Sequence, residues 1–108
     1  MSQKVEIVVY GAEQLCPSCV NLPSSMETYE WLQAAIGRKY GNDYIEYKYI
    51  DIFAPPETEK YQHFAERVRN DEFFYPVVLL NDEVVGEGNP RLKTIYKRLE
   101  ENGLQAIS

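Results

Sequence analysis

The segment Glu13–Cys19 constrains the chain most, because it holds both cysteines of the protein directly after the apolar run Val5–Tyr10. β-Branched residues dominate that run and Gly11 ends it, which predicts a buried or half-buried strand. Two thiols at C-x-x-C spacing can close a small disulfide, pass on a pair of electrons, or supply two ligands to a metal. The rest of the chain has to favour one of these uses.

The hydrophobic pattern beyond the cysteines alternates between helix and strand periods. Ser24 and Glu27 have the spacing of a capping box, so a helix is expected to begin there and to stop at Gly41. Alternation over 44–52 predicts a second strand, and apolar residues at i, i+3, i+4 and i+7 over 61–68 predict a second helix.

The C-terminal third predicts a hairpin followed by a helix. Phe73–Leu80 is expected to be a strand that turns tightly at Asn81–Glu83 into Val84–Gly86. Asn89 is expected to cap the last helix, with Pro90 at its first position. The order β-α-β-α-β-β-α predicts an α/β, three-layer fold with a four-stranded mixed sheet and helices on its faces.

Length and charge limit the classes of protein that fit. The 108 residues are expected to form a single domain, 1–108. A net charge of −6 argues against nucleic acid and against docking to anionic lipid. We see no signal peptide and no apolar run near the roughly 20 residues of a membrane span. A cytoplasmic location is therefore expected, where a C-x-x-C pair is more often redox-active or metal-binding than a permanent crosslink.

The loop that leaves the carboxyl end of the first strand is where an α/β sheet usually builds its site. Cys16 is expected near a helix N-terminus, which favours its thiolate, so we assign attack to Cys16 and resolution to Cys19. Pro17 should restrict the loop, and Ser18 is either a hydrogen-bond donor to the thiolate or an ordinary turn hydroxyl. Glu13 would oppose the thiolate if it lies close, and the motif contains no basic residue, so activation must come from backbone dipoles or from a distant Lys or Arg.

Two other readings stay open. The protein has no third cysteine and a single histidine, His63, expected to be partly exposed, so zinc within one monomer would need carboxylates. A dimer that contributes two cysteines from each subunit would be able to hold zinc or an iron-sulfur cluster. A non-catalytic interaction module with an unreactive pair is the remaining alternative.

Pro76 is the second informative residue, because a proline just before a hairpin strand in this architecture is expected to have a cis bond and to lie against the cysteine loop. Tyr75 would then offer backbone groups for pairing with an extended substrate segment. Trp31 and the tyrosines could line a peptide-binding surface, but their spacing favours core positions.

These motifs give the chain a resemblance to thioredoxin-fold proteins. Its segments Leu15–Pro23, which includes the C-P-S-C tetrad, and Phe73–Pro76 most resemble the small bacterial YuzD-like family, which is regarded as a family of disulfide oxidoreductases. The resemblance implies that Cys16 and Cys19 are the redox pair and that Pro76 is a cis-proline facing them.

The chain also departs from better-known members of that fold. Leu15 replaces the tryptophan that precedes the first cysteine in thioredoxin, and Tyr10 occupies the position of its buried acid. Tyr75 replaces the small residue that precedes the proline in glutaredoxins, and Glu87 and Asn89 alter their glutathione-binding element, so glutathione dependence is only weakly implied. The function expected from the sequence is disulfide exchange with a protein dithiol or disulfide, supplied by an unidentified electron donor and needing no bound organic cofactor.

Overall fold

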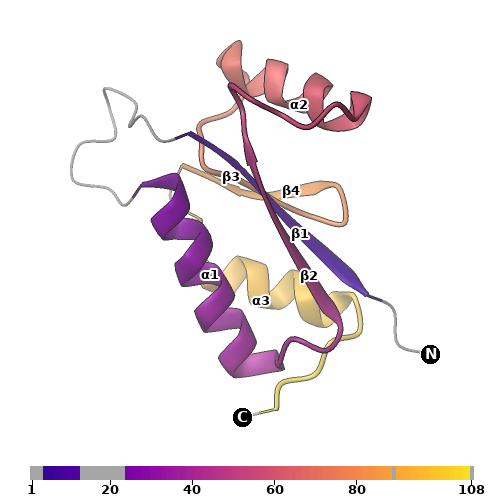
Figure 1. The fold of residues 1–108 in the computed structure, drawn as a ribbon. Coiled ribbons are helices and arrows are strands. Elements are labelled where there is room, and N and C mark those ends of the chain that lie inside the picture. Colours follow the sequence, from indigo (N-terminus) through magenta and orange to yellow (C-terminus); the bar gives the residue numbers. More distant parts are fainter. Residues whose placement is uncertain (1–3, 13–23, 89, 108) are drawn as a thin grey trace.

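Residues 4–12, 24–88 and 90–107 are described by the structure, a computed structural model. Their helices and strands follow the predicted order (Figure 1): β1 (Val5–Gly11), α1 (Ser25–Tyr40), β2 (Ile45–Asp51), α2 (Glu59–Arg69), β3 (Val77–Leu80), β4 (Glu83–Glu87) and α3 (Leu92–Glu101). In these three stretches, no helix has the length and apolar character needed to cross a bilayer.

The four strands form one mixed sheet in the order β2-β1-β3-β4, which confirms the predicted α/β sheet. β1 is parallel to β2 and antiparallel to β3, and β3 is antiparallel to β4. Tyr10 is paired with Ile50 on one side and with Val77 on the other. The carboxyl ends of β1 and β2 and the start of β3 therefore meet at the same edge of the sheet.

Successive side chains of a strand point to opposite faces of the sheet, so the core consists of two clusters, one on each face. Ile7 and Val9 of β1 pack with α1 and α3 on one face, whereas Val8 and Tyr10 pack with α2 on the other. Figure 1 shows α1 and α3 on one side of the sheet and α2 on the opposite side. This arrangement is the three-layer architecture that alternating strands and helices predict.

Local capping starts α1 where the sequence predicted. The Glu27 backbone N–H donates to the Ser24 hydroxyl at 3.1 Å, and the Ser24 backbone N–H donates to the Glu27 carboxylate at 3.0 Å. The hydrogen bond from the Ser24 backbone N–H to the Glu27 carboxylate is the main reason the pKa of Glu27 lies below its usual value. The helix ends at Tyr40, and Gly41 follows with φ of 78°, which confirms both predicted boundaries.

The hairpin is confirmed, but its first strand is shorter than predicted. Asn81 and Asp82 have φ of 50° and 70°, as a two-residue turn with two left-handed residues requires. The strand begins at Val77 rather than Phe73, because Pro76 has no N–H for the ladder. Instead, the Gly88 N–H donates to the carbonyls of the segment before the strand, those of Phe74 and Pro76.

Two other predictions were wrong. α3 begins at Leu92, two residues after Pro90, and its N-cap is Arg91. Pro90 is buried, and its Cβ lies 2.8 Å from the position a Cβ would occupy on Gly86 of β4. Arg91 after it is extended, with φ of −102° and ψ of 126°, so the helix begins only beyond this contact. The predicted cap, Asn89, lies outside the described residues. The second wrong prediction is the core position of Trp31. Its side chain is 45% exposed, because other residues of α1 form the buried face of that helix.

Candidate functional site

All four predicted residues of the C-P-S-C tetrad, Cys16, Pro17, Ser18 and Cys19, lie in the segment 13–23, outside the residues that the structure describes. The structure does describe the residues on both sides of that segment. These are the last residues of β1 with Ala12, and the first residues of α1. We therefore build the candidate site from the edge of the sheet that the cysteine segment leaves and rejoins.

Residues that flank the segment 13–23, which we call the cysteine segment, are in direct contact. The Ala12 N–H donates to the Ser25 hydroxyl at 3.2 Å, and both residues are buried. Ser25 is 3% exposed and is the first residue of α1, whereas Ala12 directly follows β1. A buried donor without a partner is costly, so this contact matters for the local structure.

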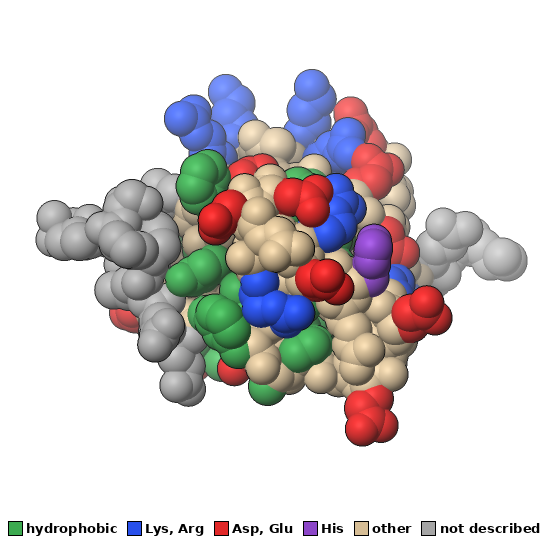
Figure 2. Space-filling view, turned by 90° about the horizontal axis from the view of Figure 1, so that it is seen from above, with side chains coloured by type: hydrophobic (Ala, Val, Ile, Leu, Met, Phe, Trp, Pro, Cys, Tyr) green, Lys and Arg blue, Asp and Glu red, His purple; other side chains and the backbone are tan. Residues whose placement is uncertain are grey.

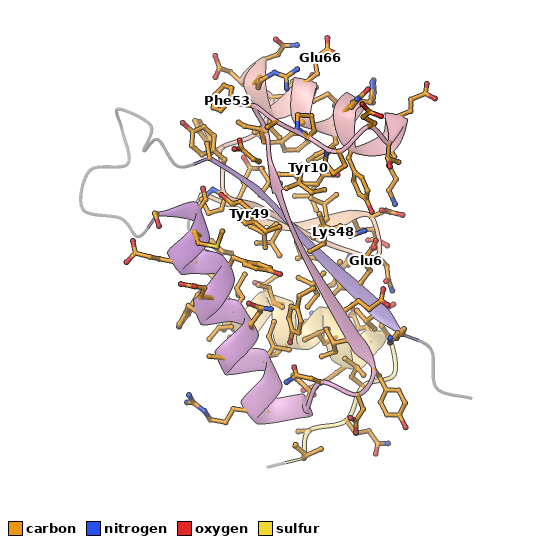
Figure 3. The ribbon with its side chains drawn as sticks, in the orientation of Figure 1. Glu6, Tyr10, Lys48, Tyr49, Phe53 and Glu66 are labelled. Atoms are coloured by element: carbon orange, nitrogen blue, oxygen red, sulfur yellow. The ribbon has the colours of Figure 1, made fainter. Side chains whose placement is uncertain are left out.

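Gly11 makes the contact possible because it has no side chain. A Cβ at Gly11 would lie 2.3 Å from the Ser25 Cβ, 2.6 Å from its hydroxyl oxygen and 2.9 Å from the Tyr49 hydroxyl oxygen. Tyr49 comes from β2, and its ring packs against that of Tyr29 on α1, with 5.4 Å between centroids. In Figure 3, Tyr49 lies beside the start of α1. We call Gly11, Ala12, Ser25 and Tyr49 the segment base.

The Tyr75–Pro76 peptide bond is cis, which agrees with the expected geometry. Pro76 is buried and directly precedes Val77, the partner of Tyr10 near the end of β1. The cis-proline therefore lies at the same sheet edge as the segment base. Neither backbone group of Tyr75 makes a hydrogen bond to another described residue.

Large apolar side chains lie exposed around this edge. Phe53 follows the end of β2 and is 59% exposed, and Phe74 precedes the cis-proline and is 64% exposed. Met26, in the first turn of α1, is also exposed. Figure 2 shows several hydrophobic side chains gathered on one part of the surface, and Figure 3 places Phe53 near the end of β2. We call Phe53, Phe74 and Met26 the apolar rim.

Tyr10 lies beneath the same edge, on the α2 face of the sheet. It is almost fully buried, and its ring is 4.6 Å from that of Phe64 between centroids. Burial, with smaller contributions from Tyr61, Asp82 and Glu6, raises the pKa of Tyr10 far above its usual value. The phenol therefore stays protonated at neutral pH, so β1 supplies a neutral group at this position.

The opposite end of the sheet is occupied by charged side chains. Lys60 lies 3.1 Å from Asp82 and 4.0 Å from Glu6, and the Lys48 ammonium donates to the Tyr61 hydroxyl at 2.9 Å. Glu6 and Lys48 lie on that side in Figure 3, away from Phe53. This end therefore has paired charges where the cysteine edge has apolar side chains.

His63 is exposed on α2. Among the side chains that the structure describes, no group of three His, Cys, Asp or Glu residues comes together as a metal site. Cys16 and Cys19 lie outside these described side chains.

Sequence reasoning missed the segment base and the apolar rim. The pair Ser24-Ser25 was a usable signal, because one serine is enough for a cap and the second needs another role. Gly11 was interpreted only as the end of a strand. Nothing in the sequence indicated that Phe53 would be exposed, since a single aromatic residue after a strand is equally compatible with the core.

Comparison with known families places the chain in one of them. The model of the family described as "Protein of unknown function (DUF1462)" matches residues 8–100. The match spans most of the chain, so the protein belongs to this family, whose description assigns no activity.

Two relatives cover nearly the whole chain. A curated protein from Bacillus subtilis (strain 168), named "Putative disulfide oxidoreductase YuzD", is 53% identical over 103 residues, which are 95% of each protein. The crystal structure of a protein of unknown function, SA0789 from Staphylococcus aureus, is 42% identical and superimposes with a TM-score of 0.81. That match covers 93% of this chain and 92% of the other.

Proposed function

We propose that the protein is a thiol-disulfide oxidoreductase of thioredoxin-like fold that exchanges disulfides with a protein partner through Cys16 and Cys19. The observation that carries the proposal is the 53% identity to a protein named as a disulfide oxidoreductase. The position of Tyr75 and Pro76, directly before the residue that pairs with Tyr10 near the end of β1, supports it.

The proposed chemistry is a pair of thiol-disulfide exchanges. The Cys16 thiolate attacks one sulfur of the partner's disulfide, forming a mixed disulfide and releasing the other partner sulfur as a thiolate that takes up a proton. The Cys19 thiolate then attacks the Cys16 sulfur, which releases the second partner thiol and leaves a Cys16–Cys19 disulfide. Two electrons have passed to the partner, and a dithiol reductant must return two electrons to close the cycle.

The partner is proposed to bind along the cis-proline edge. The backbone groups of Tyr75, which make no hydrogen bond to the other described residues, are suited to pairing with an extended segment of the partner. The apolar rim would bury exposed ring surface against that segment, which is the use that such exposed apolar groups most often have. Pro17 and Ser18 are proposed to contact the partner from within the cysteine segment.

The proposal includes a cytoplasmic location, where reductants keep the dithiol reduced. The electron donor is proposed to be a dithiol or thiol reductant. The cycle needs no bound organic cofactor, because the electrons move between sulfur atoms alone.

Reduction of insulin disulfides with dithiothreitol as donor tests the proposal. The wild-type protein should accelerate insulin precipitation, and Cys16→Ser should reduce the rate to that of dithiothreitol alone. Cys19→Ser should instead accumulate mixed disulfides, visible on non-reducing gels, because the resolving thiol is absent. Activity in Cys16→Ser equal to that of wild type would overturn the mechanism, provided that both proteins have the same melting temperature.

A further inference from the structure

We propose that Ser25 is a positioning residue: it ties the start of α1 to Ala12, on the other side of the cysteine segment, and thereby sets the reactivity of the thiols between them. The inference rests on the proposed function. Ser25 touches neither a substrate nor a thiol among the described contacts, so it would act through the segment that it closes.

The hydroxyl of Ser25 is not needed by the helix that it begins. Ser24 and Glu27 already form the complete capping box of α1. Ser25 nevertheless buries its hydroxyl at 3% exposure and accepts the Ala12 N–H. The only other polar side chain in the buried set of the described residues is Thr28, one turn further along α1. The hydroxyl of Ser25 is therefore directed at the end of β1 rather than at its own helix.

The fit around Ser25 leaves no room for adjustment. A side chain at Gly11 would overlap the Ser25 Cβ, and the Tyr49 hydroxyl approaches the same point from β2. Three elements therefore meet at one small side chain. Close-packed contacts of this kind resist displacement, because any shift creates either an overlap or a void.

Closing the ends of a loop reduces the conformations open to the residues between them. The contact between Ala12 and Ser25 closes the stretch 13–24, which contains both cysteines. The same contact ties the N-terminus of α1 to the edge where Pro76 lies. The sequence predicts that the Cys16 thiolate lies near a helix N-terminus. Such a thiolate is stabilised by the helix only while the helix keeps its position. Loss of the hydroxyl should therefore weaken thiolate stabilisation.

Ser25→Ala tests the inference, with Thr28→Ala as the matched control on the same helix. We expect the iodoacetamide alkylation rate of the Cys16 thiol at pH 7 to fall about two- to threefold in Ser25→Ala, as the midpoint of its pH profile rises by about half a pKa unit. Each rate should be measured in a Cys19→Ser background so that one thiol is observed. Thr28→Ala should lower the melting temperature without moving the profile.

Hydrogen exchange of the Ala12 amide provides a second readout that does not depend on thiol chemistry. Its protection should be lost in Ser25→Ala and kept in Thr28→Ala. An unchanged alkylation profile in folded Ser25→Ala would overturn the positioning role, even if insulin reduction by the wild type had succeeded. Failure of the wild type to reduce insulin would instead count against the proposed function, so the two failures are distinguishable.

Discussion

The two ends of the sheet have opposite surfaces. Where β1 begins, Glu6 and Asp82 surround Lys60 at ion-pair distances. Where β1 ends, Gly11 is packed against Ser25, and the large rings of the apolar rim lie exposed. The first end has the solvated charges of an ordinary protein surface, whereas the second combines tight packing with exposed apolar side chains. Such a combination is typical of a binding edge.

The largest effect is expected from Gly11→Ala, at the tightly packed end. Its Cβ would stand 2.3 Å from the Ser25 Cβ, so α1 or β1 must move, and overpacking of this kind costs roughly 1–3 kcal/mol of unfolding free energy. Urea denaturation measures the loss. Gly37→Ala is the control, since its Cβ meets only the side chain of Asn42 and alanine favours the helix. Equal stability of the two variants would contradict the close packing at Gly11.

Removal of the exposed rings should reduce exchange with protein disulfides more than it reduces stability. For Phe53→Ser and Phe74→Ser we expect kcat/KM with insulin to fall about fivefold or more, as for an interface hot spot. The unfolding free energy should change by no more than about 0.5 kcal/mol, because these side chains are exposed. Exchange with the small disulfide 5,5′-dithiobis(2-nitrobenzoic acid) should persist.

Tyr44→Ser is the matched control for the apolar rim, because Tyr44 is an exposed aromatic residue that precedes β2 at the opposite end of the sheet. Its kcat/KM with insulin should equal that of wild type. If Tyr44→Ser and Phe74→Ser lost activity equally, the apolar rim would have no special role.

Smaller effects are expected where charges are paired. Lys60→Ala removes the ion pairs with Asp82 and Glu6, but all three side chains are solvent-accessible, so the loss should be below about 1 kcal/mol. Added salt should shrink the difference between this variant and wild type, because it screens exposed pairs. A chemical denaturation series in urea at low and high salt measures both. A loss that is large and independent of salt would contradict the solvated character of this end.

At neutral pH the ionisation of the partly buried Tyr47 should have no effect on stability, and its contribution should emerge only in alkali. Burial raises the pKa of Tyr47 to about 12 from its usual 10. The folded state thus holds this proton more tightly than the unfolded state, so its stabilisation is complete below about pH 10 and is lost as pH rises towards 12. Tyr47→Phe should show a shallower fall of the urea midpoint between pH 9 and pH 12. Equal slopes for the two proteins would contradict this assignment.

Much of the fold followed from signals that are local in the chain. The capping box of Ser24 and Glu27 and the turn at Asn81 and Asp82 involve residues at most three apart, so their chemistry alone specifies their geometry. The cis bond before Pro76 was expected from its place before a hairpin. The mixed sheet with helices on both faces also followed, because the apolar periods leave few arrangements that bury both faces.

The segment base depends on contacts that no local pattern contains. Ala12 and Ser25 are thirteen residues apart, and Tyr49 comes from another strand, so only the packed sheet brings them to Gly11. The solvent exposure of Phe53 and Phe74, the exposure of Trp31 and the late start of α3 depend in the same way on what other elements cover. The physical reason is that propensity and capping act within a few residues. Burial is a property of the whole assembled surface.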